Sequence, residues 1–492
     1  MTRTTGFDPE AGRLQGVSSV VDAQTAASAI DPDDVVLVSG FGGVGYPKRV
    51  PEALASGYSG LGLTVVSGGG VGAEIDDRLV ESGNIARRYP FQTRRTSRNA
   101  INDGRVGFHD RHISRFGDEV RFGEYGTPDL AIVEAVAVGD GWLVPSTSIG
   151  HTPSFVAAAD RLIVEVNRTQ PLELARVHDV YLRELPPNRE AIPLEGPTDR
   201  IGGPAISFDP ATLVAVVETD RADDPYEFRD PDDTDRQIAE GLGTFLEAEL
   251  DGNPMLAETV HLQFGVGSMG NALMGTLGAV DFGDRDVVYF GEVFQDGLLD
   301  SIDSGLLSGA SATSLALSET GQRRLFADID RYAADVTLRP ASVSNNPALV
   351  ERFGVVGVNS AIEVDLYGNA NATHIGGTHL VNGIGGGGDF NRNCRLSVLA
   401  LPSTAGDGDI SRIVPMCPHV DHTEHDFSVV VTEHGIADLR GATPRERARA
   451  LVDIADPSFR RDLRAYLRRA KEGGGNTPHD LETVFEWQNS RD

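Results

Sequence analysis

The hydrophobic positions of this chain fall mostly into short continuous runs, each flanked by glycine or by an acidic residue. Such runs are typical of strands in a parallel sheet that is covered on both faces. They predict strands at 35–38, 63–66, 130–133, 162–166, 213–217, 287–290 and 429–431. Helical segments are predicted between several of them, for example at 46–56 and 233–248. This alternation predicts an α/β fold with a central sheet between layers of helices.

The C-terminal part of the chain is predicted to form a helical tail. Thr443 and Glu446 make a capping box around Pro444, which is a good first residue for a helix. A second helix with one apolar face is predicted at about 457–469, and it ends before the glycines at 473–475.

A domain boundary is predicted at 220–235, where acidic residues and prolines are densest between a strand and a helix. The chain then divides into two domains, 1–225 and 226–492. Each contains a strand that runs into a glycine loop and a helix, at 35–47 and at 260–271. The two elements suggest a duplicated domain; chance is the alternative, because 57 glycines produce many accidental matches.

Composition narrows the classes of function. The 492 residues include 73 acidic and 43 basic ones, and the formal charge of −30 argues against a nucleic-acid binder or a basic membrane-surface protein. Lys48 and Lys471 are the only lysines, so almost all basic residues are arginines, a balance that resembles proteins of a high-salt cytoplasm. No apolar run suits a signal peptide or a membrane span, which predicts a soluble cytoplasmic protein.

One glycine loop allows a nucleotide-binding interpretation. Residues 265–270 match G-x-G-x-x-G between a strand and a helix, and the acid Glu292 follows the next strand. That arrangement is typical of a dinucleotide site, so an NAD-dependent oxidoreductase is one hypothesis. Against it, a predicted helix at 233–248 precedes the strand, whereas a dinucleotide unit usually begins with its strand.

The same residues allow a second interpretation, in which Glu292 is a nucleophile. A carboxylate is already ionised at neutral pH and can attack a thioester carbonyl without a base. The reaction then needs donors for the oxyanion, and the amides of glycine loops suit this role because no side chain blocks the approach. Such loops occur at 265–270 and at 383–388. The ordinary alternative for Glu292 is a structural ion pair.

The histidines His419, His422 and His425 recur every third residue and raise the hypothesis of a metal site. On a helix this spacing rotates the side chains off a common face, and the segment leads directly into a strand. We therefore expect a polar, hydrogen-bonded loop and no metal. The sequence also lacks the motifs of serine hydrolases, P-loop proteins and zinc ribbons.

Several segments occur together in one order along the chain. They are GFGGVGYPK (40–48), RRTSRNAIN (94–102), VPSTSIGHTP (144–153), FGVGSMGNA (264–272), YFGEVFQDG (289–297), SNNP (344–347), IEVDLYGNAN (362–371), NGIGGGGDF (382–390), IVPMCPHVDHTEHD (413–426) and VVTEHGIADLRG (430–441). This combination resembles the acetyl-CoA hydrolase/transferase family, and most closely its succinyl-CoA:acetate CoA-transferases. The resemblance implies a class I CoA-transferase fold with two related open α/β domains.

The resemblance also implies roles for individual residues. Glu292 matches the glutamate that forms a glutamyl-CoA thioester, and the amides of Val266 and Gly386 match the oxyanion donors. Asn345 and Glu433 match polar residues that position the reacting carboxylates. The remaining matches line the CoA site: Gly265, Val266, Gly267, Ser268, Met269, Gly270, Asn271, Ile362, Asn382 and Gly386. Arg221 is the nearest candidate for the arginine that meets the carboxylate end of a substrate.

One departure concerns the CoA phosphates. Relatives usually carry a lysine directly after the STA of segment 403–405, where this chain has Gly406. The phosphate contact is then either lost or moved to another residue, for which Arg412 is the candidate.

The sequence thus predicts a CoA-transferase that moves CoA between acetyl-CoA or succinyl-CoA and a carboxylate such as acetate or succinate. It is expected to need no cofactor beyond coenzyme A as co-substrate and no metal. A homodimer is the family expectation, without nucleic-acid or membrane partners. An acetyl-CoA hydrolase that uses the same glutamate is the nearest alternative, and a binding protein with a dead site or an NAD-dependent oxidoreductase is more distant.

Overall fold

The computed structural model describes residues 6–227 and 229–484 of the chain, except the side chains of Ser268 and Met269. By Cα packing the chain forms two compact units. Unit 1 comprises the residues up to Glu227 together with Val288–Leu349, and unit 2 comprises Phe228–Val287 together with the residues from Val350 onward. The first crossing lies within the boundary predicted at 220–235. Two continuous domains were expected at 1–225 and 226–492, but residues 288–349 belong to unit 1. They do so because they pack with residues of the N-terminal part, which are far away in the sequence.

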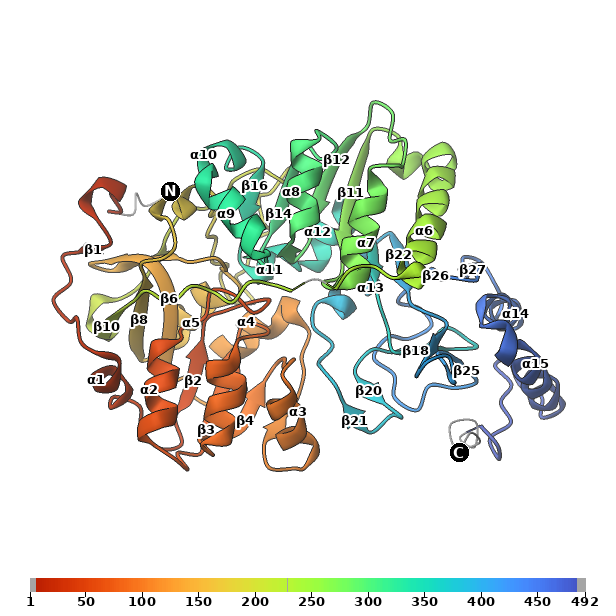
Figure 1. Cartoon of the computed structure of the whole chain (residues 1–492), viewed down its shortest axis with the longest axis horizontal. Coiled ribbons are helices and arrows are strands. Elements are labelled where there is room, and N and C mark those ends of the chain that lie inside the picture. The colour runs from red at the N-terminus through yellow and green to blue at the C-terminus, as the bar shows by residue number, and fades with distance from the viewer. Residues whose placement is uncertain (1–5, 228, 485–492) are drawn as a thin grey trace. The chain divides into compact units, whose positions relative to one another are not determined.

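Unit 1 is built on a ten-stranded sheet (Figure 1). Its path runs β10 (Leu213–Thr219), β8 (Arg161–Asn167), β6 (Leu130–Gly139), β2 (Val35–Val38), β3 (Leu63–Ser67), β4 (Ile85–Tyr89) and β5 (Gly107–Phe108), all parallel to their neighbours. The strands β1 (Leu14–Gln15), β7 (Trp142–Pro145) and β9 (Ile206–Ser207) join beside this path.

Alternate residues of these strands pack against helices on opposite faces of the sheet. Val36 and Val38 belong to one apolar cluster, which α1 (Ala23–Ala27), α2 (Arg49–Gly57) and α3 (Arg95–Asn102) complete. Leu37 belongs to another cluster, completed by α4 (Ile113–Arg121) and α5 (Thr152–Ala158). Because both faces are covered, the strands are apolar throughout, and this is the reason they were recognisable as continuous runs.

The later part of unit 1 carries two predicted site residues. Parallel strands β12 (Asp286–Phe290), β14 (Gly309–Ala312) and β16 (Val336–Leu338) lie side by side, and the short strands β13 (Val293–Phe294) and β15 (Ser314–Leu315) pair next to them in sequence. The helices of this part are α8 (Asp296–Asp303), α9 (Glu319–Ala327), α10 (Ile329–Tyr332) and α11 (Ala341–Ser344), and α12 (Pro347–Arg352) follows. Glu292 lies between β12 and β13, and Asn345 follows α11.

Unit 2 contains a second run of parallel strands. Their order is β11 (Thr259–Phe264), β17 (Val356–Asn359), β22 (Leu396–Ala400) and β26 (Val429–Thr432), with β27 (Gly435–Asp438) antiparallel to β26. Its helices are α6 (Asp233–Gly252), α7 (Ser268–Leu277), α13 (Gly387–Asn393), α14 (Pro444–Ile454) and α15 (Pro457–Glu472). Short pairings complete it: β18 (Glu363–Asp365) with β19 (Ala370–Asn371) and β25 (Ile413–Val414), β20 (His374–Ile375) with β21 (His379–Leu380), and β23 (Thr404–Ala405) with β24 (Ile410–Ser411).

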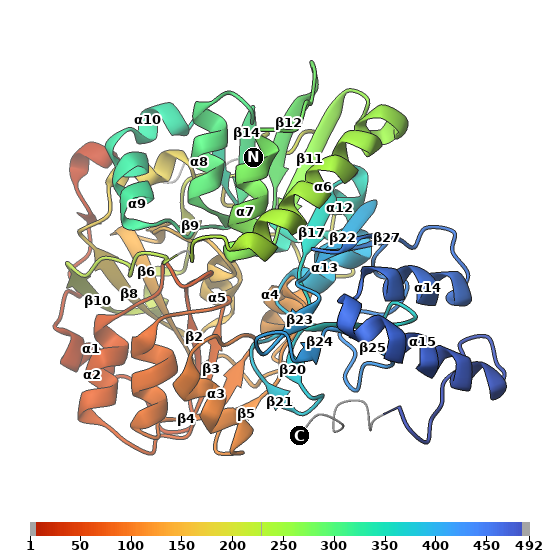
Figure 2. The ribbon, with the colours of Figure 1, turned by 45° about the vertical axis from the view of Figure 1, so that its right-hand side comes forward.

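The C-terminal helices confirm the predicted helical tail. The capping box of Thr443 and Glu446 is present at the start of α14, and α15 ends at Glu472 with Gly473 as its C-cap residue. The two helices lie next to each other (Figure 2). Phe459 and Leu463 of α15 are buried in the same apolar cluster as Leu451 of α14, which fixes the tail to the rest of unit 2.

The α/β architecture is confirmed, and each of the seven predicted strands coincides with part of an observed strand. Among the described helices, none is both long enough and apolar enough to pass through a lipid bilayer.

Candidate active site

Glu292 is held by its backbone in a tight turn at the end of β12. Its carbonyl accepts hydrogen bonds from the amides of Thr313 (2.7 Å) and Ser314 (3.2 Å). The preceding residue must be glycine, because a Cβ at Gly291 would lie 2.4 Å from the hydroxyl oxygen of Tyr289. The hydroxyl of Tyr289 donates a hydrogen bond to the carbonyl of Val293 at 3.1 Å, which stabilises the turn on the other side of Glu292.

The carboxylate of Glu292 is oriented by Asn345. The side-chain amide of Asn345 donates to Glu292 Oε1 at 2.7 Å, while Asn345 itself is fully buried. Its backbone amide donates to the carbonyl of Ala341 at 2.9 Å, which fixes the residue at the end of α11. A neutral amide holds a carboxylate in place without neutralising its charge, so this arrangement suits a carboxylate that acts as a nucleophile.

Arg221 also lies in unit 1, where it pairs with two carboxylates. Its guanidinium is 3.0 Å from Glu52 Oε2 and contacts Glu74, and its side chain is 33% exposed. Its carbonyl accepts a hydrogen bond from the side chain of Asn167 at 2.8 Å. Two carboxylates already share this guanidinium, so a role in binding a substrate carboxylate would require it to exchange one of them.

In unit 2, the predicted glycine segment 265–271 forms the loop between β11 and α7 and the first turn of that helix. The amide of Gly265 donates to the carbonyl of Val358 at 2.9 Å. Gly267 caps α7 with a φ of 133°, which only glycine adopts readily. Val266, the apolar residue between these two glycines, is 41% exposed. Ser268 and Met269 begin the helix, but their side chains lie outside the described part, and Gly270 and Asn271 continue it.

The second glycine loop precedes α13 of the same unit. Gly386 is the N-cap residue of this helix and is buried, with an ordinary helical φ of −82°. Asn382 lies upstream of it, and its Oδ1 is buried without a hydrogen-bond partner among the described residues. Ile362 lies at the start of the neighbouring segment, where its amide donates to the carbonyl of Asn371 at 2.7 Å. A buried acceptor without a partner is an unusual feature and is compatible with a ligand that donates to it.

A buried amide network lies beside both glycine loops and was not predicted. Asn359 donates to Gln263 Oε1 at 3.1 Å and to Asn391 Oδ1 at 2.9 Å, and Gln263 donates back to Asn359 at 3.2 Å. Asn359 also contacts the position that a Cβ of Gly265 would occupy, at 3.4 Å. The network thus ties the end of β11, which leads into the first loop, to α13, which follows the second. The sequence offered one signal for this network, because Gln263 and Asn359 are polar residues near the carboxyl ends of the apolar strands β11 and β17.

Glu433 follows β26 and is bound by Ser403. The amide and the hydroxyl of Ser403 donate to its two carboxylate oxygens at 2.8 and 2.6 Å. Arg412 is half-buried, and burial lowers the pKa of its guanidinium, while Glu433 and Glu363 raise it. The Nε of Arg412 has no partner in the described part of the chain. An arginine in this state retains a donor for an incoming anion.

The structure places Gly406 in a backbone conformation that lysine rarely adopts. This residue has a φ of 59° in the turn between β23 and β24, and Asp407 follows with a φ of 56°. Two successive left-handed residues favour glycine and aspartate over lysine.

The histidine segment lies in a loop before β26. His419 is 3.1 Å from Asp421, and the backbone of His422 pairs with Ala370, while His425 is exposed beside Glu424. Among residues 6–227 and 229–484, no group of three or more His, Cys, Asp or Glu side chains is placed to hold a metal ion.

Two buried histidines of unit 1 should make stability fall in acid. Burial lowers the pKa of His151 to about 4 and that of His178 to about 4, from 6.5. Between pH 6.5 and about 4 the unfolded chain therefore binds protons that the folded chain does not. The stability contributed by these groups is complete above pH 6.5 and is lost as the pH falls through that range.

His151→Leu tests this dependence. His151 packs against Phe116 and Phe155, and neither of its ring nitrogens has a hydrogen-bond partner among the described residues. We expect the stability of the variant relative to the parent to rise as the pH falls from 7.5 to 5, measured by thermal unfolding. His109→Leu is the control, since that side chain is 66% exposed. A difference that is the same at both pH values would contradict the prediction.

Comparison with known proteins identifies the family of the chain. The N-terminal domain of acetyl-CoA hydrolase/transferase matches residues 14–218, and the C-terminal domain matches residues 321–467. The succinyl-CoA:acetate CoA-transferase of Clostridium kluyveri is 40% identical over 95% of this chain and 88% of its own length. The propanoyl-CoA:succinate CoA transferase of Escherichia coli is 38% identical over 94% and 96%. An acetyl-CoA hydrolase of Neurospora crassa is 38% identical over 91% and 89%.

Solved structures show the same fold. RipA from Yersinia pestis matches with a TM-score of 0.70 at 22% identity, over 92% of this chain and 97% of its own. The 4-hydroxybutyrate CoA-transferase from Porphyromonas gingivalis matches with a TM-score of 0.62 at 21% identity, over 92% and 97%. The two family models match most of the chain, and the named relatives span nearly all of it. The chain therefore belongs to the acetyl-CoA hydrolase/transferase family.

Proposed function

We propose that the chain is a CoA-transferase that exchanges CoA between a short-chain acyl-CoA, such as acetyl-CoA or succinyl-CoA, and a carboxylate, such as acetate or succinate. The observation that carries the proposal is the 2.7 Å hydrogen bond from Asn345 to Glu292, which orients an ionisable carboxyl group at the end of β12. The relatives named above, whose names are those of CoA-transferases and an acetyl-CoA hydrolase, support the same chemistry.

Glu292 is the nucleophile in this scheme. One carboxylate oxygen attacks the thioester carbonyl, and collapse of the tetrahedral intermediate releases CoA thiolate and leaves a mixed anhydride on the side chain. The thiolate then attacks the glutamyl carbonyl and releases the free acid, which leaves a glutamyl-CoA thioester. The second carboxylate reverses these steps. The amides of Val266 and Gly386 are assigned to the oxyanion, Glu433 to positioning of the substrate carboxylate, and Arg221 to its far end.

The covalent intermediate gives the direct test. Enzyme mixed with acetyl-CoA in the absence of any acceptor acid should gain the mass of CoA less one water, measured on the intact protein. Acetate or succinate should then discharge it within a turnover. An active, folded sample that gains no mass would overturn the proposal.

The same measurement separates a transferase from a hydrolase. A hydrolase also forms the adduct, but water discharges it without any acid, whereas a transferase should keep it for many turnover times. A nicotinamide oxidoreductase, the other interpretation of the 265–270 loop, would form none, and neither would a binding protein with a dead site.

Gly386→Ala tests the oxyanion assignment. Alanine adopts a φ of −82° without strain, so a loss of activity would report crowding at the amide. We expect kcat to fall by about 10²-fold, the effect of losing one oxyanion donor. Gly278→Ala is the matched control, because this glycine of unit 2 has a φ of −63° and open space around it. An unchanged kcat in the first variant would place the donor elsewhere.

A cytoplasmic homodimer adapted to high salt is part of the proposal. The net charge of −30 and the near absence of lysine support the salt adaptation, and the family resemblance supports the dimer. Sedimentation in about 0.1 M and about 3 M salt tests both, since concentrated salt screens repulsion between acidic surfaces.

A further inference from the structure

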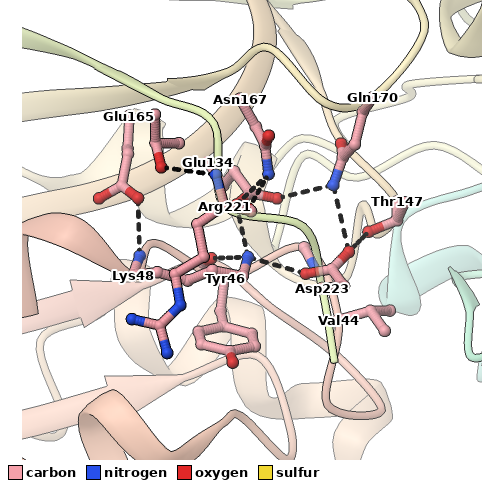
Figure 3. A network of polar contacts seen from close by, with 12 residues as sticks. Val44, Tyr46, Lys48, Glu134, Thr147, Glu165, Asn167, Gln170, Arg221 and Asp223 are labelled. Carbon is pink, nitrogen blue, oxygen red and sulfur yellow. Dashed lines mark hydrogen bonds and ion pairs between the residues drawn. The ribbon is translucent and has the colours of Figure 1, made fainter. Parts of the chain in front are cut away.

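Unit 1 contains a closed ring of four buried polar side chains (Figure 3). Lys48 Nζ lies 2.6 Å from Glu134 Oε2 and 2.8 Å from Asp223 Oδ1. On the opposite side of the ring, Gln170 Nε2 donates to Glu134 Oε1 and to Asp223 Oδ2, both at 3.1 Å. The four residues are between 1% and 5% exposed. Every oxygen of both carboxylates is therefore used within the interior of the unit.

Such a ring is costly to bury, and charge alone does not explain it. Apolar side chains of similar volume often stabilise a protein as well as a buried ion pair does. What the ring supplies is a fixed position for Asp223, which lies near the beginning of the segment that follows β10. The carbonyl of Arg221, two residues earlier, is also held by Asn167 at 2.8 Å.

Asp223 in turn holds two loops. Its Oδ1 accepts a hydrogen bond from the amide of Gly45 at 3.1 Å, and its Oδ2 accepts one from the hydroxyl of Thr147 at 2.5 Å. The first loop, residues 40–45, contains four glycines with positive φ, so its side chains offer little packing to fix it. A second link joins the loops, because the hydroxyl of Ser148 donates to the carbonyl of Val44 at 3.1 Å.

The loop at 147–150 contacts the segment that supports Glu292. The carbonyl of Thr147 accepts a hydrogen bond from the amide of Leu315, and the amide of Ile149 donates to the carbonyl of Thr313, both at 2.9 Å. The amide of Thr313 is the group that donates to the Glu292 carbonyl at 2.7 Å. A continuous path of hydrogen bonds therefore connects Asp223 to the backbone of the nucleophile.

The same loop also reaches the residue that orients the nucleophile. The carbonyl of Gly150 accepts a hydrogen bond from the amide of Ala341 at 2.8 Å, at the first residue of α11. Asn345 caps the other end of that short helix. Movement of the 147–150 loop would thus displace Glu292 and Asn345 together.

We propose that Asp223, acting through the hydroxyl of Thr147, is a positioning residue that sets the geometry of the Glu292–Asn345 pair. This inference rests on the proposed function, in which Glu292 attacks the thioester. A reactive carboxylate must be held to a fraction of an ångström, and small displacements by residues remote from the chemistry lower kcat strongly. Substrate binding is less affected, because the ring and its two loops are not assigned to bind CoA or the acid.

The test compares Thr147→Val with Thr147→Ser. Valine keeps the shape of threonine and removes the hydroxyl, whereas serine keeps the hydroxyl and removes the methyl group. We expect kcat of the valine variant to fall about 10- to 100-fold, with KM for acyl-CoA and for the acid within about twofold, and the serine variant to stay within about threefold of the parent. Thr64→Val is the control, a buried threonine of β3 outside this network.

The opposite pattern, an active valine variant and an impaired serine variant, would assign Thr147 to packing and overturn the proposal. If the valine variant does not fold, Asp223→Asn replaces it, and parent-like kcat in that variant would overturn the proposal too. Failure of the proposed function is distinguished by the parent enzyme, which would then form no CoA adduct. An adduct in the parent with equal kcat in Thr147→Val would refute only the positioning role.

Discussion

Glu292→Gln is expected to lower kcat by at least about 10³-fold, the scale of losing a covalent catalyst. Glutamine has nearly the same shape, and Asn345 can still donate to its Oε1, so the turn after β12 should be retained. What disappears is the negative charge and with it the oxygen nucleophile. The variant should also gain no mass with acetyl-CoA, because the amide cannot form the thioester.

Steady-state kinetics and intact mass measure this result, with thermal unfolding as the check on the fold. Glu319→Gln is the matched control, since that glutamate of α9 in the same unit is 72% exposed and should leave kcat unchanged. A Glu292→Gln enzyme that kept more than a tenth of the parent activity would show that another residue attacks the thioester.

The seven strands listed from the sequence, five of them in the ten-stranded sheet of unit 1, were predictable because burial on both faces makes them continuous apolar runs. The strand β4 shows where this reasoning fails. Its sequence, Ile85 to Tyr89, contains two arginines, and Arg88 is fully buried in an ion pair with Asp76 at 2.7 Å. From the sequence alone, a charged residue in a strand is interpreted as exposed, because the partner that allows its burial lies in another element. Only the tertiary structure supplies that partner.

The division of the chain shows a related limit. The composition at 220–235 marked one crossing between units, because a linker leaves a local signal of acids and prolines. The crossings at 287–288 and 349–350 occur within strand β12 and within helix α12, where no such signal exists. They follow from packing between segments far apart in the chain.

In the candidate site, the motifs identified Glu292 and Asn345 separately, but not the hydrogen bond that joins them across 53 positions. The ring around Asp223 was missed entirely. Its four members come from the loop after β2, from β6, from the segment after β8 and from the segment after β10. Because they lie far apart in the sequence, no short stretch of the chain contains two members of the ring. The one available signal was compositional, because Lys48 is one of two lysines in a chain that otherwise uses arginine.

Lys48→Met is expected to destabilise the protein by about 3 to 5 kcal/mol at pH 8, because it leaves two buried carboxylates without their cation. Methionine fills nearly the same space as the lysine side chain, so little of this loss should come from packing. Lys471→Met is the matched control: this other lysine lies exposed near the end of α15, and its loss should change stability by less than about 0.5 kcal/mol.

The pH dependence of that loss separates charge from packing. Burial raises the pKa of Glu134 to about 7 although Lys48 opposes the shift; Asp223 and Glu165 raise it further. Without Lys48 this carboxyl is harder still to ionise in the folded state, whereas in the unfolded chain it ionises near pH 4.5. The destabilisation should therefore grow as the pH rises through 7, by about 1.4 kcal/mol for each pH unit above it. Adding Glu134→Gln to Lys48→Met removes one uncompensated charge and should recover part of the loss at pH 8. Denaturant unfolding at pH 5.5 and pH 8 measures each difference, and an equal loss at both values would assign the role of Lys48 to packing.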